Sequence, residues 1–160
     1  MKSSKFAIRK SALATMATLI VTSFLFASNV QAQQLKLVTV KSAKSFEATV
    51  DGIKKGVADA GMMVLAEINQ GKVLSMTGLT INAESLFIGN PNVGKEALSD
   101  NAAVGLVIPL RVNIYEDKGV TYINYFTPSS ELGYFKGDKV KMIGQELDKK
   151  IAMLTGMVSK

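Results

Sequence analysis

A predicted strand in the second half of the chain carries the side chains best suited to bind a ligand. Successive residues of a strand point to opposite faces, so Arg111, Asn113 and Tyr115 share one face. Arg111 is the only arginine beyond residue 32, and its planar donors suit a carboxylate or phosphate group. A structural ion pair or a solvated sheet face would explain the same pattern. Tyr125 on the following strand is a further candidate ligand-binding residue, although a one-residue change of register would replace it with Tyr122.

A second candidate segment, residues 89–95, matches a phosphate-binding loop up to its last position. There Glu96 replaces the serine or threonine whose hydroxyl would hold magnesium, and Pro91 lacks one of the N–H groups that would contact phosphate. The sequence instead predicts a loop shaped by Gly89 and Pro91. In this loop Asn90 is a candidate ligand-binding residue.

The residue types that are absent limit the chemistry. The chain has no histidine and no cysteine, which excludes a Ser-His-acid triad, a cysteine nucleophile and the usual transition-metal ligand sets. We therefore predict no catalytic residue, no metal and no cofactor, and favour a non-catalytic binding protein. The alternative is a small metal-independent hydrolase or isomerase that uses arginine, tyrosine and carboxylate groups. A deep pocket with a carboxylate of shifted pKa would favour the enzyme, and a flat apolar patch would favour assembly.

The start of the chain has the features of a secretory signal. An uncharged, mostly apolar stretch over residues 11–27 follows four basic residues, Lys2, Lys5, Arg9 and Lys10. The stretch is shorter than the roughly 20 apolar residues of a membrane span, although a retained anchor is the alternative. Cleavage between Ala32 and Gln33 would leave residues 33–160 as a single periplasmic or secreted domain.

The charge of the mature chain argues against nucleic acid as a partner. Without the four basic residues of the signal, 15 of the 19 Lys and Arg residues remain against 13 Asp and Glu, a net charge of +2. Nucleic-acid-binding domains normally carry a clustered basic surface. We expect a small molecule or an envelope protein as the partner, a homodimer, and no stable membrane span after cleavage.

Two helices carry the clearest helical pattern. The first is expected to begin after a Ser45 cap and to end at Gly61. Gly52 and Gly56 lie inside it at a cost of about 1 kcal/mol each relative to alanine, which suggests close approach to a neighbouring element. The last helix is expected to be capped by Asp138. Its apolar stripe consists of Val140, Ile143, Leu147, Ile151, Leu154 and Val158.

The remaining apolar runs predict a mostly antiparallel sheet. A hairpin with its turn at residues 116–119 is the strongest signal, Pro109 marks an edge, bulge or bend, and residues 69–78 open a short turn or helix. The expected strands are residues 35–41, 62–68, 79–81, 85–88, 103–115 and 120–126. The order of strands and helices predicts an α+β fold in which both main helices cover one face of the sheet.

Several short motifs occur in an order that resembles the bacterial family known as domain of unknown function 302. They are Gly61, residues 88–91, residues 108–112, residues 115–117, and Tyr125 before Pro128. The resemblance extends from about Val38 to the end of the chain. It implies a TATA-box-binding-protein-like arrangement of strand, helix, four strands and helix, often as a homodimer. It does not imply DNA binding, because one fold hosts many functions.

One position departs from the pattern of that family. Many members have a histidine soon after the second strand, where this sequence has Gln70. If Gln70 is the matching position, any metal, haem or acid–base role of that histidine does not carry over to this chain.

Overall fold

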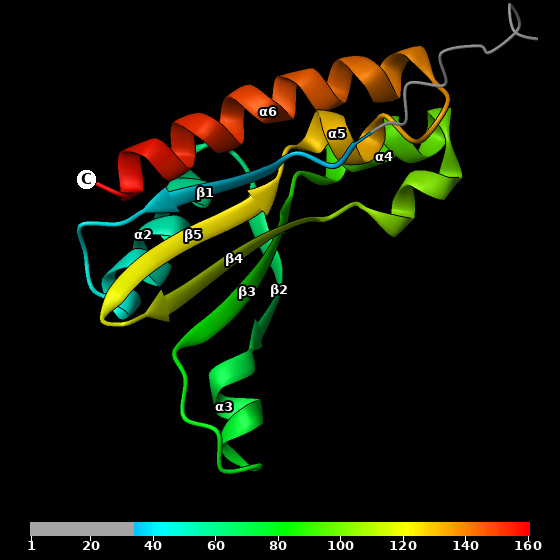
Figure 1. Cartoon of the computed structure of the whole chain (residues 1–160). Coiled ribbons are helices and arrows are strands. Elements are labelled where there is room, and N and C mark those ends of the chain that lie inside the picture. The colour runs from blue at the N-terminus through cyan, green and yellow to red at the C-terminus, as the bar shows by residue number, and fades with distance from the viewer. Residues whose placement is uncertain (1–33) are drawn as a thin grey trace, which may run out of the picture. The chain divides into compact units, whose positions relative to one another are not determined.

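Five strands form one antiparallel sheet in the order β1-β5-β4-β3-β2 (Figure 1). The computed structural model describes residues 34–160, so the predicted signal and its cleavage site lie outside the described residues. The strands are β1 (Leu37–Lys41), β2 (Met63–Asn69), β3 (Ala83–Gly89), β4 (Leu110–Asp117) and β5 (Val120–Phe126). The helices are α2 (Phe46–Asp59), α3 (Gln70–Ser75), α4 (Pro91–Asp100), the 3₁₀ helix η1 (Ala102–Leu106), α5 (Pro128–Leu132) and α6 (Asp138–Val158).

Helices α2 and α6 cover one face of the sheet, which confirms the α+β prediction (Figure 1). Alternation along β4 sends Val112 and Ile114 into the core, where they join Ile53 of α2 and Leu154 of α6. All six predicted stripe residues of α6 are buried. The sequence order strand, helix, four strands, helix is also correct, with α3, α4, η1 and α5 placed between these elements.

The contact between the two main helices depends on glycine. A Cβ atom at Gly52 would lie 2.8 Å from Val158 Cγ1, and one at Gly56 would overlap Leu154 Cδ1. The predicted close approach at these glycines is therefore confirmed. Ser45 caps α2 by accepting a hydrogen bond from the Ala48 N–H at 3.3 Å, also as expected.

The cap of α6 differs from the prediction. Asp138 is the first helical residue, Gly137 takes the N-cap position, and no side chain of the cap residue bonds to the helix. The carboxylate of Asp100, at the end of α4, instead accepts a hydrogen bond from the Val140 N–H at 3.2 Å. A carboxylate from another element thus satisfies an N–H that the helix leaves unpaired.

Three predicted elements of the middle region are wrong. The expected loop at residues 89–95 contains the start of α4, because Asn90 acts as N-cap and Pro91 fits the first helical turn. The expected strand over residues 103–115 begins only at Leu110, since Asn101 caps η1 through the Ala103 N–H. Residues 79–81 form no strand.

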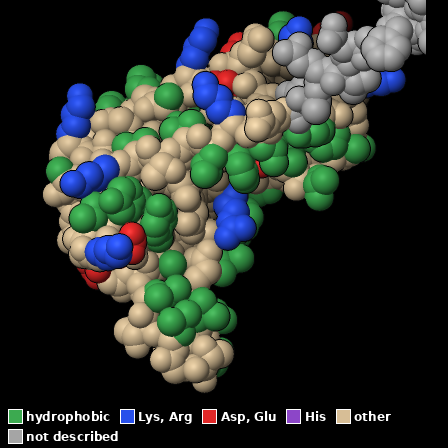
Figure 2. Space-filling model, in the orientation of Figure 1, with side chains coloured by type: hydrophobic (Ala, Val, Ile, Leu, Met, Phe, Trp, Pro, Cys, Tyr) green, Lys and Arg blue, Asp and Glu red, His purple; other side chains and the backbone are tan. Residues whose placement is uncertain are grey.

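Helix α3 and the segment that leads to β3 extend beyond the end of the sheet (Figure 1). Hydrophobic side chains gather on this extension (Figure 2). Those exposed there are Val73, Met76, Leu79 and Ile81. None of the helices within residues 34–160 is both long enough and apolar enough to cross a membrane.

Candidate functional site

The register of the hairpin decides which tyrosine shares a face with Arg111. A two-residue turn at Lys118 and Gly119, both with positive φ (51° and 76°), pairs Tyr115 with Tyr122. Tyr122 therefore joins the Arg111 face, and its ring stacks on that of Tyr115 with centroids 5.4 Å apart. The side chain of Tyr125 points to the opposite face and is only 5% exposed. It lies on the other face from Arg111, although Tyr125 is among the residues that line the hollow described below.

Ser85 on β3 organises the polar side chains of the face that the helices leave open. Its hydroxyl accepts hydrogen bonds from Arg111 Nε at 3.1 Å and Gln70 Nε2 at 2.6 Å. It donates to Asn113 Oδ1 at 3.1 Å, so both lone pairs and the proton are used. Asn113 in turn donates to Asn124 Oδ1 at 3.0 Å. These five residues are called the Ser85 network, which brings Arg111 and Asn113 together as the alternation predicted.

Arg111 is held in place without being neutralised. Its guanidinium lies 6.0 Å from the centre of the Phe87 ring, and Nε is bonded to Ser85. Both ion pairs found within residues 34–160 belong to Lys54. The outer N–H groups of Arg111 therefore have no carboxylate partner in the described part of the chain, and the structural ion-pair interpretation of Arg111 is not supported.

A hollow of about 500 Å³ lies beside this cation. We call it the Arg111 hollow, and the residues that line it are Leu37, Arg111, Asn113, Asn124, Tyr125, Phe126 and Glu131. Leu37 and Phe126 are exposed apolar side chains, so polar and apolar groups meet there. Burial raises the pKa of Glu131. Tyr115 is not among the lining residues.

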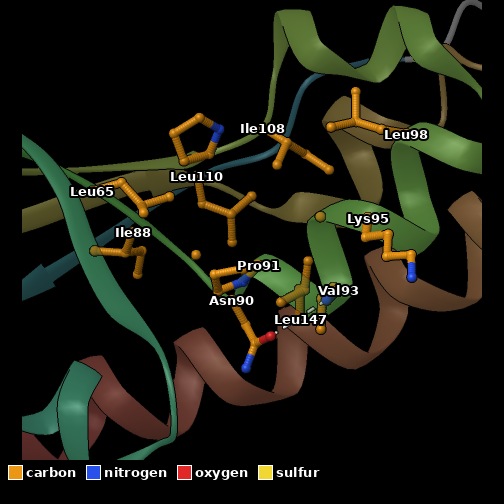
Figure 3. A pocket seen from close by; sticks show the side chains of 13 residues that line it. Leu65, Ile88, Asn90, Pro91, Val93, Lys95, Leu98, Ile108, Leu110 and Leu147 are labelled. Atoms are coloured by element: carbon orange, nitrogen blue, oxygen red, sulfur yellow. Dashed lines mark hydrogen bonds between the residues drawn. The ribbon is translucent and has the colours of Figure 1, made fainter.

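Asn90 occupies a different place. Its Oδ1 accepts hydrogen bonds from the Asn92 N–H at 2.9 Å and the Val93 N–H at 3.4 Å, and its Nδ2 donates to the Gly61 carbonyl at 2.8 Å. The Asn90 amide is therefore used to cap α4 and to fix the end of α2. Gly89, Asn90 and Pro91 line a second hollow of about 340 Å³ (Figure 3). The predicted binding residues thus fall into two separate groups.

Gln70 begins α3 and belongs to the Ser85 network. Its Nε2 is bonded to Ser85, but its Oε1 is buried and has no hydrogen-bond partner among residues 34–160. The position that the family resemblance associates with histidine therefore lies at the edge of the open-face network.

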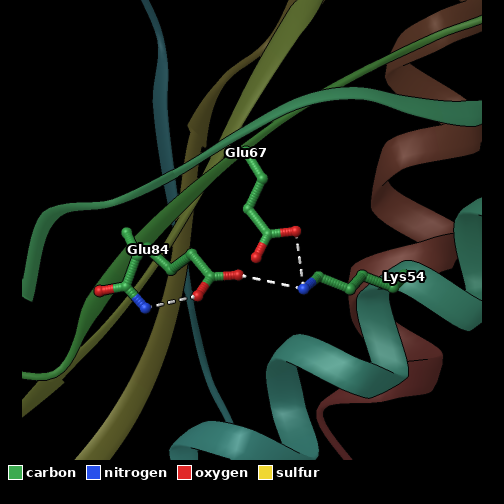
Figure 4. A network of polar contacts seen from close by, with 4 residues as sticks. Lys54, Glu67 and Glu84 are labelled. Atoms are coloured by element: carbon green, nitrogen blue, oxygen red, sulfur yellow. Dashed lines mark hydrogen bonds and ion pairs between the residues drawn. The ribbon is translucent and has the colours of Figure 1, made fainter. Parts of the chain in front are cut away.

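A third polar cluster escaped the sequence analysis. Lys54 Nζ of α2 lies 2.8 Å from Glu67 Oε2 and 3.4 Å from Glu84 Oε1 (Figure 4). Asn69 Nδ2 donates to Glu84 Oε2 at 3.0 Å, whereas Glu84 Oε1 has only the ion pair within the described part of the chain. The contact with Lys54 was hidden because it joins a helix to two strands. The available signal in the sequence was Glu84, an acidic residue directly before the expected apolar strand 85–88.

The charges of this cluster perturb one another. The Lys54 hydrogen bond holds the pKa of Glu67 below its usual range. Burial, together with the neighbouring Glu67, raises the pKa of Glu84. Desolvation would lower the pKa of Lys54, but the Glu67 hydrogen bond and the charges of both carboxylates together raise it. A raised pKa keeps this lysine protonated and argues against a nucleophilic role. In the described residues, no group of three or more acidic side chains is placed to hold a metal ion.

Comparison with known proteins places the chain in a family. The profile of the family described as Domain of unknown function DUF302 matches residues 38–157. The crystal structure of an uncharacterized conserved DUF302 protein from Bacillus stearothermophilus has the same fold, with a TM-score of 0.72 and 21% identity over 78% of this chain and 98% of that one.

Curated relatives match a shorter region. The fluoride-specific ion channels FluC 1 of Brucella suis biovar 1 and of Brucella abortus biovar 1 are each 32% identical over 82 residues, or 51% of this chain. The chain spans about a third of the length of these channels (32% and 30%). The family match, by contrast, covers most of the sequence and agrees with the resemblance drawn from the motifs. The chain therefore belongs to the DUF302 family.

Proposed function

We propose that the mature protein is an exported, non-catalytic binding protein of the bacterial envelope that binds a small molecule with a carboxylate or phosphate group at the Arg111 hollow. The observation that carries this proposal is the state of Arg111. Ser85 fixes its Nε while the outer N–H groups have no carboxylate partner in residues 34–160. A cation that is already oriented loses less entropy when it binds an anion.

The other lining residues restrict the ligand. Leu37 and Phe126 offer apolar contact beside the cation. Glu131 is half-buried and disfavours a second negative group, since two carboxylates in one site repel each other. The site therefore suits a molecule with one anionic group and an apolar body.

The hydrolase or isomerase alternative would use Glu131 as its acid–base group. Burial raises the pKa of Glu131, which a general acid at neutral pH requires. However, its carboxyl group makes no hydrogen bond with a described residue, and the stacked rings of Tyr115 and Tyr122 do not line the hollow. Tyr125 lines the hollow but is only 5% exposed, and Glu131 has no orienting partner among the described residues, so the geometry favours binding over catalysis.

The ligand class is testable with three molecules that share a ring and differ in the polar group: benzoate, phenyl phosphate and benzyl alcohol. Titration calorimetry on the mature protein should detect binding of benzoate or phenyl phosphate that depends on Arg111, and no Arg111-dependent binding of benzyl alcohol. The substitution Arg111→Ala removes a charged hydrogen-bond donor. It should weaken binding of the anion by about 1.5–3 kcal/mol, or roughly 10- to 150-fold in affinity.

The matched control is Lys41→Ala. Lys41 pairs with Tyr122, so it lies on the same face of the sheet as Arg111, but it does not line the hollow. Its substitution therefore removes one positive charge from that face and leaves the hollow unchanged. Its affinity for the anion should stay within about twofold of the unmodified protein, because exposed, distant charges are screened. Equal losses of anion affinity in both variants would show that the anion responds to the overall positive charge of this face and not to Arg111 itself. Loss of cooperative unfolding in Arg111→Ala would assign this residue to the fold.

The homodimer belongs to the same proposal and is supported by the family resemblance. Native mass spectrometry of the protein purified gently from its own envelope would report the subunit count and any retained ligand together. A dimer with an anionic molecule of small mass is the expected particle. A monomer with no retained ligand under these conditions would contradict the dimer and leave the benzoate titration to decide the binding site.

A further inference from the structure

The hollow beside Asn90 lies on the helix-covered side of the sheet and is lined by aliphatic side chains from every neighbouring element. Figure 3 shows the labelled aliphatic side chains directed toward a common space between the strands and the helices. They are Leu65 of β2, Ile88 of β3, Val93 and Leu98 of α4, Leu110 of β4 and Leu147 of α6. We call this space the Leu65 hollow.

Two large apolar side chains at this hollow are left exposed to water. Leu65 is 50% exposed and Leu98 is 43% exposed. Leu65 lies where the β2–β3 register shifts between Val64 and Ala66, and such a bulge re-aims a side chain. Gly89 leaves space for Leu65, because a Cβ atom at Gly89 would lie 3.2 Å from Leu65 Cδ1. The local backbone thus holds an aliphatic group at the hollow although water reaches it.

The polar groups of the side chains that line the hollow do not point into it. The Asn90 amide bonds to the backbone of α4 and to Gly61, and it points away from the hollow in Figure 3. Lys95, the one charged lining residue, also points away from the aliphatic groups there. A ligand would therefore meet hydrocarbon and no charged group, which disfavours ions, sugars and nucleotides.

We infer that the Leu65 hollow binds the apolar part of a small molecule, an alkyl chain or ring system of about a dozen carbon atoms. The size follows from the volume. A dry cavity of about 150 Å³ accepts one benzene molecule, and this hollow measures about 340 Å³, which is room for roughly twice as many carbon atoms. The site lies on the opposite face of the sheet from the Arg111 hollow, so this inference does not depend on the proposed function.

A series of straight-chain alcohols tests the inference directly. Calorimetry with 1-hexanol, 1-octanol, 1-decanol and 1-dodecanol should show affinity rising about fourfold for each added methylene, the equivalent of about 0.8 kcal/mol. The rise should stop once the hollow is full, near ten to twelve carbons by the estimate from cavity size. In the Arg111→Ala protein, octanoate should bind as well as 1-octanol, because no cation points into the Leu65 hollow. Affinity independent of chain length would overturn the inference.

Gly94 provides the decisive variant. It lines the hollow from within α4, and a Cβ atom there would meet no atom within 4 Å. Gly94→Leu should therefore place a side chain in the hollow without a clash and weaken 1-decanol binding at least tenfold. The matched control is Gly156→Leu in α6, where a Cβ atom also meets open space but no hollow is lined. This control shares the gain in helix propensity and should keep the affinity of the unmodified protein.

The remaining outcomes distinguish a small-molecule ligand from a protein side chain, and the Leu65 hollow from the Arg111 hollow. Normal 1-decanol affinity in Gly94→Leu would overturn the inference. Self-association of the unmodified protein that Gly94→Leu abolishes, with no alcohol bound, would also overturn it and assign the hollow to a protein side chain. Arg111→Ala should leave 1-decanol binding unchanged, so failure of the anion site would not be mistaken for failure of this one.

Discussion

At the residue scale, Lys54 stabilises two carboxylates that would otherwise face each other. Its ammonium lies 2.8 Å from Glu67 and 3.4 Å from Glu84. Lys54→Met should lower the free energy of unfolding at pH 7 by about 1–2 kcal/mol, a value reduced because Lys54 and Glu67 are partly exposed. As the pH falls through the raised pKa of Glu84, protonation of that carboxyl removes the repulsion. The cost of the substitution should therefore shrink in acid, as measured by urea unfolding across this pH range.

Glu84→Gln supplies the control for this prediction. Glutamine keeps an acceptor for Asn69 Nδ2 and removes the charge. In the Glu84→Gln protein, Lys54→Met should cost less at pH 7 than in the unmodified chain, and the acid dependence should shrink to the part that Glu67, whose pKa Lys54 lowers, contributes at lower pH. A cost for Lys54→Met that is the same at every pH would show that only the packing of the lysine stem matters.

The candidate site was partly predictable at this scale. Alternation alone placed Arg111 and Asn113 on one face, since it needs no knowledge of the partner strand. Ser85 could not be found, because its bond with Arg111 joins residues 26 positions apart and depends on strand pairing. The choice between Tyr122 and Tyr125 for the Arg111 face stayed open for the same reason, since the register followed from the two-residue turn.

At the element scale, helices α2 and α6 pack closely because Gly52 and Gly56 have no side chain at their contact. Gly56→Ala should lower the free energy of unfolding by up to about 2 kcal/mol, because overpacking against Leu154 costs about 1–3 kcal/mol and the helix-propensity gain offsets only about 1 kcal/mol of it. Gly156→Ala, on α6 and facing open space, should instead stabilise the protein by up to about 1 kcal/mol. Chemical denaturation of both variants would test the pair. Equal stabilisation by both would contradict close packing at Gly56.

The elements predicted well are those that bury a periodic face. The stripe of α6 and the cap of α2 are local patterns, so the sequence alone was sufficient. Helix α4 was missed because Asn90 and Pro91 favour a turn and an N-terminal helix cap equally well. The apolar run before Leu110 reads as strand by composition, and only Asn101 and the small residues after it indicate η1.

At the scale of the whole molecule, the prediction of export is the most direct to test. Periplasmic extracts should contain a chain whose N-terminal residue is Gln33, because the basic start and short apolar stretch are typical of a cleaved signal. Intact-mass measurement of the purified protein would detect the cleavage. An uncleaved chain beginning at Met1 and found only in membranes would show a retained anchor instead.

The two hollows share strand β4 but lie on opposite faces of it. Leu110 lines one hollow and Arg111, the next residue, lines the other. A shift of one residue along a strand moves every side chain to the other face. Substitutions can therefore adapt either hollow separately over evolutionary time, whereas a single-residue insertion or deletion in β4 would put the cation in the core and aliphatic groups on the surface. We expect descendants of this chain to diversify at β4 by exchanging residues and to keep its length fixed.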